Sequence, residues 1–184
     1  RLTGVSRETQ SGISVLSALE IYAQLLAKWQ TKINLVSKNS LNILWTRHIL
    51  DSAQLIPHLP ELPVKIIDVG SGAGLPGIIL AILSRHDIHL VESDQRKCAF
   101  LRTAVRETGA TATIHNERIE ALVDMNPDII TARALAPLDK LLELTRQQHH
   151  ENLQFLFLKG RKAKQELTSL SSWPKLSAVL HPSI

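Results

Sequence analysis

The sequence predicts an α/β fold, in which a Rossmann-like parallel sheet follows an N-terminal helical cap. Two observations lead to this prediction. Over the first 60 residues, apolar side chains recur at three- and four-residue spacings, which is typical of amphipathic helices. From residue 61 onward, short apolar runs alternate with helical patterns, as they do in β/α units whose strands are covered on both faces. We therefore expect a helical cap over residues 1–60 and a core over residues 61–184, which together form one globular unit.

Two helices are expected in the cap. The first covers "VLSALEIYAQLLAKW" (15–29), and the second covers "SLNILWTRHILDSAQLI" (40–56) with Ser40 as its N-cap. The prolines of "PHLPELP" (57–63) then end the helical part.

Five β/α units are expected in the core. The predicted strands are "VKIIDV" (64–69), "DIHLVES" (87–93), "TATIH" (111–115), "PDIITARA" (127–134) and "LQFLFLK" (153–159). The predicted helices between them are "LPGIILAILSR" (75–85), "DQRKCAFLRTAVRETG" (94–109), "ERIEALV" (117–123) and "PLDKLLELTRQQ" (137–148). After the fifth strand the chain is expected to be helical again, which completes the fifth unit. The last residues, "AVLHPSI" (178–184), resemble a strand that is cut short. We expect both chain ends to be incomplete.

Composition and charge narrow the classes of protein that fit the chain. Of its 184 residues, 44% are hydrophobic, which suffices for a buried core. The single cysteine, Cys98, excludes a disulfide framework and favours a reducing compartment. No apolar run approaches the ~20 residues that span a bilayer. The net charge of +4 is a weak bias toward an anionic partner. We expect a cytoplasmic monomer with no membrane partner and no bound metal.

A glycine-rich stretch, "IIDVGSGAGLPG" (66–77), directly follows the first predicted strand. Its second half matches the dinucleotide fingerprint G-x-G-x-x-G. The whole stretch also matches the D-x-G-x-G-x-G loop of methyltransferases that use S-adenosylmethionine. Asp68 favours the second interpretation, because a carboxylate inside the cleft repels a pyrophosphate and attracts an ammonium and a sulfonium. The cofactor contacts expected here are Asp68, Gly70, Gly72 and Gly74.

Other candidate site residues follow the later strands, because ligands of such sheets bind at the carboxyl ends of the strands. Glu92 ends the second strand and is expected to accept hydrogen bonds from ribose hydroxyls. Ile119 is expected to cover an adenine ring, with Glu120 or the backbone near its amino group. Arg133 ends the fourth strand and is suited to a methionine carboxylate, a phosphate, or O6 and N7 of a guanine.

The residues after the fourth strand bear on the chemistry. A D/N-P-P-Y loop, which acts on exocyclic amines, is absent. Cys98 is in phase with the apolar face of its helix, so it is expected in the core rather than as a nucleophile. The acceptor is then an atom with a lone pair and no proton to lose, such as a ring nitrogen. Catalysis would be mainly positioning, with Arg133 in that role and no general base.

Several blocks together resemble one family, the bacterial 16S ribosomal RNA guanine-N7 methyltransferases, once called glucose-inhibited division protein B. These blocks are "KWQTKINLVS", "TRHILDSAQL", "DVGSGAGLPGIILAI", "ERIEAL", "TARALAPL" and "FLKGR". The resemblance covers about residues 28–162. It implies the class I S-adenosylmethionine-dependent methyltransferase fold, and methylation of one guanine in a conserved loop near the decoding centre. The partner would be 16S ribosomal RNA, in the small subunit or an assembly intermediate.

The resemblance also implies site residues. Cofactor contacts fall on Gly70, Leu75, Ile119, Glu120 and Arg133. Contacts to RNA or to the acceptor fall on Arg47, His48, Asp51 and Ser52 at the cleft mouth, with Lys159 and Arg161 at the end of the fifth strand. A simpler interpretation of the first group is an ion pair between Arg47 and Asp51 within one helix. The family usually continues to a final antiparallel strand pair, which this chain lacks.

Three other functions remain open from sequence alone. A methyltransferase of the same fold with a small-molecule or protein substrate is one, because fold does not fix substrate. A nicotinamide-dependent oxidoreductase is the second, and a catalytically silent RNA-binding protein is the third. Methylation without RNA would favour the first, and binding of NADH would favour the second.

Overall fold

A computed structural model describes residues 8–9, 11–173 and 176–182. Its centre is a five-stranded sheet whose paired strands all run parallel, in the order β3-β2-β1-β4-β5. The strands are β1 Lys65–Val69, β2 Asp87–Val91, β3 Thr113–His115, β4 Ile129–Arg133 and β5 Gln154–Leu158. The helices are α1 Val15–Gln30, α2 Asp51–Ala53, α3 Gly77–Leu83, α4 Gln95–Thr108, α5 Leu138–Leu144 and α6 Ala163–Glu166. The predicted five strands and their parallel arrangement are confirmed.

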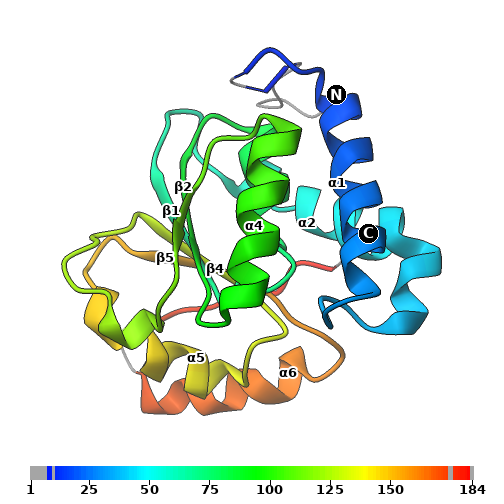
Figure 1. The fold of residues 1–184 in the computed structure, drawn as a ribbon. Coiled ribbons are helices and arrows are strands. Elements are labelled where there is room, and N and C mark those ends of the chain that lie inside the picture. The colour runs from blue at the N-terminus through cyan, green and yellow to red at the C-terminus, as the bar shows by residue number, and fades with distance from the viewer. Residues whose placement is uncertain (1–7, 10, 174–175, 183–184) are drawn as a thin grey trace.

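The main core lies between the sheet and α1, α3 and α4, which pack against one another (Figure 1). All seven residues of α3 are buried, because this helix is covered by both the sheet and the cap. A smaller apolar cluster covers the other face of the sheet, where Ile67 and Ile130 pack with Ile119 and Leu122. The order of the strands places the ends of β1 and β4 side by side, and the candidate site lies there.

Helix α4 begins and ends where the sequence predicts. The side chain of Asp94 caps its N-terminus by accepting from the backbone N–H groups of Arg96 and Lys97. Gly109 ends it in the left-handed conformation, with a φ of 65°. Cys98 is fully buried in this helix, which confirms the prediction that it belongs to the core.

The second helix of the cap differs from the prediction. In place of one α-helix over residues 40–56, the chain forms a 3-10 helix at Lys38–Ile43, a π-helix at Trp45–Leu50 and the short α2. Ser40 is not an N-cap. Its hydroxyl donates to the carbonyl of Ser37 and lies 2.8 Å from Nε2 of His48, so local and tertiary hydrogen bonds compete with regular helix.

Two smaller predictions are also corrected. The predicted helix at residues 117–123 is a single 3-10 turn, Ile119–Ala121. Residues 176–182 form neither strand nor helix, so the strand expected at the end of the chain is wrong for the part that the structure describes. These residues are largely exposed, and without strand partners their apolar character alone does not form a strand.

Tyr22 ties the cap to the glycine loop. Its side chain, on the inner face of α1, is fully buried. Its hydroxyl donates to the carbonyl of Ala73 at 2.7 Å. We expect Tyr22→Phe to lower the free energy of unfolding by about 1–3 kcal/mol, because the buried carbonyl loses its donor. Urea denaturation measures this change, and Leu16→Ala, on the exposed face of α1, is the control. Equal stability of the Tyr22→Phe and wild-type proteins would contradict the prediction.

Candidate active site

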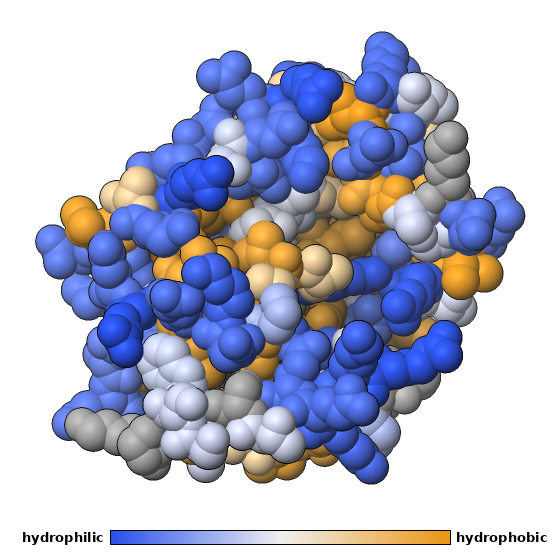
Figure 2. All heavy atoms as spheres, turned by 90° about the horizontal axis from the view of Figure 1, so that it is seen from below, coloured by the Kyte–Doolittle hydropathy of each residue, from blue (hydrophilic) through white to orange (hydrophobic). Residues whose placement is uncertain are grey.

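A cavity of about 700 Å³ opens at the carboxyl ends of β1, β2 and β4, beneath the cap. Figure 2 views this face of the molecule and shows a recess with apolar residues in its wall and hydrophilic residues around it. Of the residues predicted from sequence, those that line the cavity are Gly70, Gly72, Leu75, Glu92, Ile119, Glu120, Arg133, Arg47 and His48. Most of the residues expected to bind the cofactor therefore share one cavity with Arg47 and His48, two of the six expected at the RNA or the acceptor.

The glycine loop forms one wall of the cavity. Gly72 has a φ of 54°, a conformation that L side chains rarely adopt. A Cβ at this position would have only the carbonyl oxygen of Gly70 at 3.7 Å and Oε2 of Glu92 at 4.0 Å nearby. The bare backbone thus leaves an open cradle on the side of Glu92. Gly74 differs, because a Cβ there would overlap the side chain of Ile78, so this glycine serves packing rather than the cavity.

Asp68 lies beneath the loop and not on the cavity wall, unlike the position expected from sequence. Its side chain is fully buried. The carboxylate accepts from the N–H of Gly77 at 3.2 Å and from the hydroxyl of Thr131 at 3.0 Å. Its backbone carbonyl accepts from the hydroxyl of Ser71. Asp68 therefore joins β1, β4 and both ends of the glycine loop.

Burial raises the pKa of Asp68 to about 7, although hydrogen bonds to its carboxylate, among them those from Thr131 and Gly77, oppose this rise. A raised pKa in the folded state means that the group contributes most stability below its usual pKa near 4 and loses it as pH rises through about 7. We expect the free energy of unfolding of the wild type to fall relative to Asp68→Asn between pH 4 and pH 7. Urea titrations of both proteins at several pH values measure this difference, and parallel curves would contradict it.

Glu92 joins the end of β2 to the glycine loop. Its Oε2 accepts from the N–H of Gly72 at 2.9 Å, and its Oε1 accepts from the N–H of Asp94 at 2.8 Å. The side chain is nearly buried yet lines the cavity. Because each carboxylate oxygen accepts more than one hydrogen bond, Glu92 can hold the loop and still receive a hydroxyl from a ligand.

Arg133 reaches from the end of β4 to the cap. Its Nη2 donates to Nδ1 of His48 at 2.6 Å and to the carbonyl of Arg47 at 3.0 Å. Its Nη1 lies 3.6 Å from Oδ2 of Asp51 and has no hydrogen-bond partner among the described residues. Asp51 thus pairs with Arg133 across the site, and no ion pair between Arg47 and Asp51 is found among the residues that the structure describes. The Nη1 group itself is buried, so its unused hydrogen-bonding capacity lies within the protein.

Three of the residues expected to contact RNA or the acceptor do not line the cavity. Ser52 is fully buried and donates to the carbonyl of His48. Lys159 pairs with Glu166 at 2.6 Å and donates to the carbonyl of Ala136 at 2.7 Å, so its ammonium is already engaged. Arg161 is exposed beyond the end of β5.

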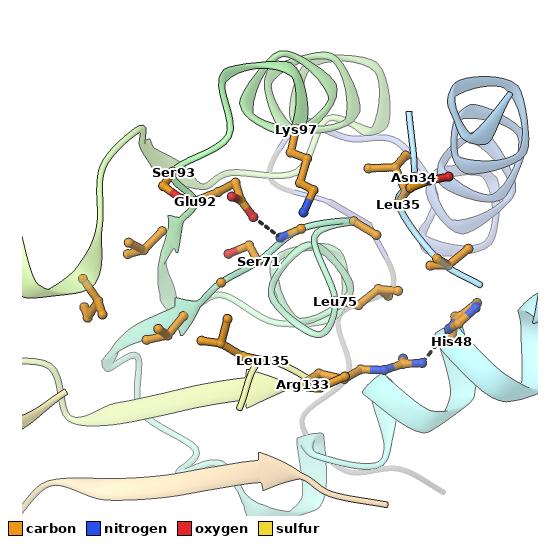
Figure 3. A pocket seen from close by; sticks show the side chains of 18 of the residues that line it. Asn34, Leu35, His48, Ser71, Leu75, Glu92, Ser93, Lys97, Arg133 and Leu135 are labelled. Atoms are coloured by element: carbon orange, nitrogen blue, oxygen red, sulfur yellow. Dashed lines mark hydrogen bonds between the residues drawn. The ribbon is translucent and has the colours of Figure 1, made fainter. Parts of the chain in front are cut away.

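Sequence reasoning missed two parts of the cavity wall. The stretch Asn34–Ser37 lies across the cavity from the loop and is held by Gln30, whose amide donates to Val36 and accepts from Leu35 and Val36. Lys97 extends from the first turn of α4 over the glycine loop (Figure 3). Lys97 lies in the first turn of the helix that follows β2, and this position was the signal in the sequence that could have placed it at the cavity.

A family model described as "GidB: rRNA small subunit methyltransferase G" matches residues 15–183. The chain belongs to this family. A relative named "Ribosomal RNA small subunit methyltransferase G" from Paramagnetospirillum magneticum is 47% identical, covering 99% of this chain and 86% of the relative. One of the same name from Gluconobacter oxydans is 50% identical, covering 99% and 91%. The resemblance found in the sequence is therefore confirmed.

Solved structures support the same fold at much lower identity. A ribosomal protein L11 methylase from Lactobacillus delbrueckii has a TM-score of 0.57 and 19% identity, covering 66% of this chain and 65% of that one. A precorrin-6y C5,15-methyltransferase from Geobacter metallireducens has a TM-score of 0.52 and 13% identity, covering 76% and 73%. The predicted Rossmann-like methyltransferase fold is thereby confirmed. Among the described residues, no helix is long and apolar enough to cross a membrane.

Proposed function

We propose that this chain is an S-adenosylmethionine-dependent methyltransferase that methylates N7 of a specific guanine in 16S ribosomal RNA, in a conserved loop near the decoding centre. Membership of the methyltransferase G family supports the substrate class, and the resemblance of the sequence blocks supports the target atom. The observation that carries the proposal is the cavity itself, where the open glycine loop and the side chains of Glu92 and Arg133 line one space.

The residues around the cavity fit S-adenosylmethionine. The cradle at Gly72 is one that a Cβ would fill, so backbone can approach a ligand closely there. Glu92 stands beside this cradle as an acceptor for ribose hydroxyls, and Ile119 supplies an apolar surface for the adenine. Arg133 offers a cation to the methionine carboxylate or to the acceptor guanine. When bound, the sulfonium of this cofactor supplies an electrophilic methyl group.

Methylation of N7 requires that the reactants be positioned, and it requires no proton transfer. N7 of guanine carries a lone pair and no proton, so no general base would be needed when this lone pair forms the bond to the methyl carbon and the carbon–sulfur bond breaks, with a neutral thioether as leaving group. The site must instead hold the nucleophile and the methyl group in line and exclude water. Cys98 is buried, donates to the backbone of Glu92 and does not line the cavity, so a cysteine nucleophile is not available there.

Asp68 no longer speaks against a nicotinamide cofactor. Its carboxylate lies under the glycine loop and not in the cleft, so it would not repel a bound pyrophosphate there. Membership of a methyltransferase family disfavours a nicotinamide cofactor instead. We further propose that the protein is a cytoplasmic monomer and acts on the small ribosomal subunit or an assembly intermediate.

Labelled S-adenosylmethionine and small subunits from cells that lack the enzyme test the proposal. We expect label in 16S ribosomal RNA, at one site that strand-scission chemistry specific for 7-methylguanosine reveals. Naked 16S RNA in a parallel reaction distinguishes free RNA from the assembled particle as substrate. Label in protein or in small molecules, or in RNA without scission, would overturn the proposed substrate or target atom.

A further inference from the structure

The segment that contacts Arg133 is wound as a π-helix, Trp45–Leu50. In an α-helix the N–H of Asp51 would bond to the carbonyl of Arg47. Here it bonds to the carbonyls of Thr46 and His48 instead. The Arg47 carbonyl accepts from Arg133, and the same wide turn presents the imidazole of His48 and the carboxylate of Asp51. A local departure from α-helix thus directs three groups at one guanidinium, in keeping with the frequent use of π turns at functional sites.

The contact with Arg133 fixes the tautomer of His48. A guanidinium only donates, so Nδ1 of His48 must accept at 2.6 Å. The proton of the neutral ring then sits on Nε2 and is donated to Ser40, 2.8 Å away. The hydroxyl of Ser40 in turn donates to the carbonyl of Ser37 at 2.7 Å. This series of hydrogen bonds connects Arg133, through His48 and Ser40, to Ser37. Ser37 belongs to the stretch 34–37, which lines the opposite wall of the cavity.

The surroundings keep the imidazole in its neutral, accepting form. His48 is only 4% exposed. Burial, and then the positive charges of Arg133 and Arg47, lower its pKa to about 4, while Asp51 opposes them. The ring is therefore neutral at physiological pH, and Figure 3 shows it directed at Arg133. The hydrogen bonds with Arg133 and Ser40 occupy both ring nitrogens.

We propose that His48 is a positioning residue for Arg133, which orients the guanidinium in the cavity wall and makes no RNA contact of its own. The sequence led us to expect His48 at the RNA or the acceptor, but its ring is buried and both of its nitrogens are engaged. The inference rests on the proposed function, because its test uses the rate of methyl transfer.

The first test compares two substitutions at His48. His48→Leu removes the acceptor, whereas His48→Asn keeps an amide oxygen near the position of Nδ1. We expect His48→Leu to lower kcat/KM by about tenfold, the effect of one hydrogen bond to a charged group, and His48→Asn to restore it to within about threefold of wild type. Equal losses in the two variants would overturn the proposal.

A double-mutant cycle gives the sharper result. If His48 acts only through Arg133, His48→Leu has no further effect on single-turnover rate in an Arg133→Ala background. If His48 contacts RNA itself, the loss persists in that background and the proposal fails. Wild-type protein that transfers no methyl group to RNA would instead refute the proposed function, before any variant is compared.

The matched control is His86. It is also buried, and its Nδ1 also accepts a hydrogen bond, from the N–H of Val64, but it lies at the other end of the sheet. We expect His86→Leu to lower thermal stability and leave the kcat/KM of the folded protein unchanged. A tenfold loss of kcat/KM in His86→Leu as well would show a general effect of losing a buried histidine, and would overturn the positioning role.

Discussion

Arg133→Ala should lower kcat/KM for methyl transfer by roughly 10- to 100-fold while the protein remains folded. A hydrogen bond to a charged group contributes about 1.5–3 kcal/mol, and about 1.4 kcal/mol corresponds to a factor of ten in rate. Arg133 lines the cavity beside the glycine loop, so its side chain lies where a bound ligand would meet a positive charge. Radiolabel transfer to small subunits measures the rate, and calorimetry measures the affinity for S-adenosylmethionine.

The two measurements together separate the roles that sequence left open for Arg133. Weaker cofactor binding would assign the guanidinium to the methionine carboxylate. A lower rate at saturating cofactor would assign it to the RNA, either to the guanine or to a phosphate. Arg106→Ala is the charge-matched control, because Arg106 is exposed on α4 and pairs only with its neighbour Glu107 among the described residues. Wild-type rate and affinity in Arg133→Ala would remove this residue from the site.

Gly72→Ala should weaken binding of S-adenosylmethionine by roughly 10- to 100-fold. A non-glycine residue at a φ of 54° costs about 1–2 kcal/mol, and the new methyl group would occupy the cradle beside Glu92. Relief of the strain would break the hydrogen bond from the Gly72 N–H to Glu92. Calorimetric titration of the cofactor measures the loss.

Alanine substitutions at two other glycines are controls, one for backbone strain and one for the added methyl group. Gly12 has a φ of 82° and open space where a Cβ would lie, so Gly12→Ala adds strain far from the cavity. Gly160 has open space and no positive φ, so Gly160→Ala adds only the methyl group. Both variants should bind the cofactor as the wild type does. Unchanged affinity in Gly72→Ala would show that the loop is not the cofactor cradle.

Local patterns in the sequence were enough for much of the fold. The alternation of apolar runs and helical patterns predicted all five strands, and Gly109 marked the end of α4. These features depend on short-range physics, namely side-chain periodicity, capping and the φ that glycine allows. The family followed from several blocks taken together, and the match over residues 15–183 confirms it.

The sequence also placed most of the cavity lining, because the carboxyl ends of parallel strands meet at one edge of the sheet. Gly72, Glu92 and Arg133 each follow a strand and line the cavity as expected. It failed at Asp68, which also ends a strand but turns under the loop to bond with Gly77 and Thr131. Strand position gives the neighbourhood of a side chain, whereas its direction depends on which donors the neighbouring elements offer.

By itself, then, the sequence determined the class of fold, the family and the strand ends that form the site. Only the tertiary structure decided how the charges pair among the described residues: Asp51 with Arg133 rather than with Arg47, and Lys159 with Glu166. It also decided that residues 45–50 wind as a π-helix around Arg133, although their pattern predicts an α-helix. The physical reason is that hydrogen bonds and ion pairs between distant elements outweigh the few tenths of a kcal/mol that helical propensity and spacing contribute per residue.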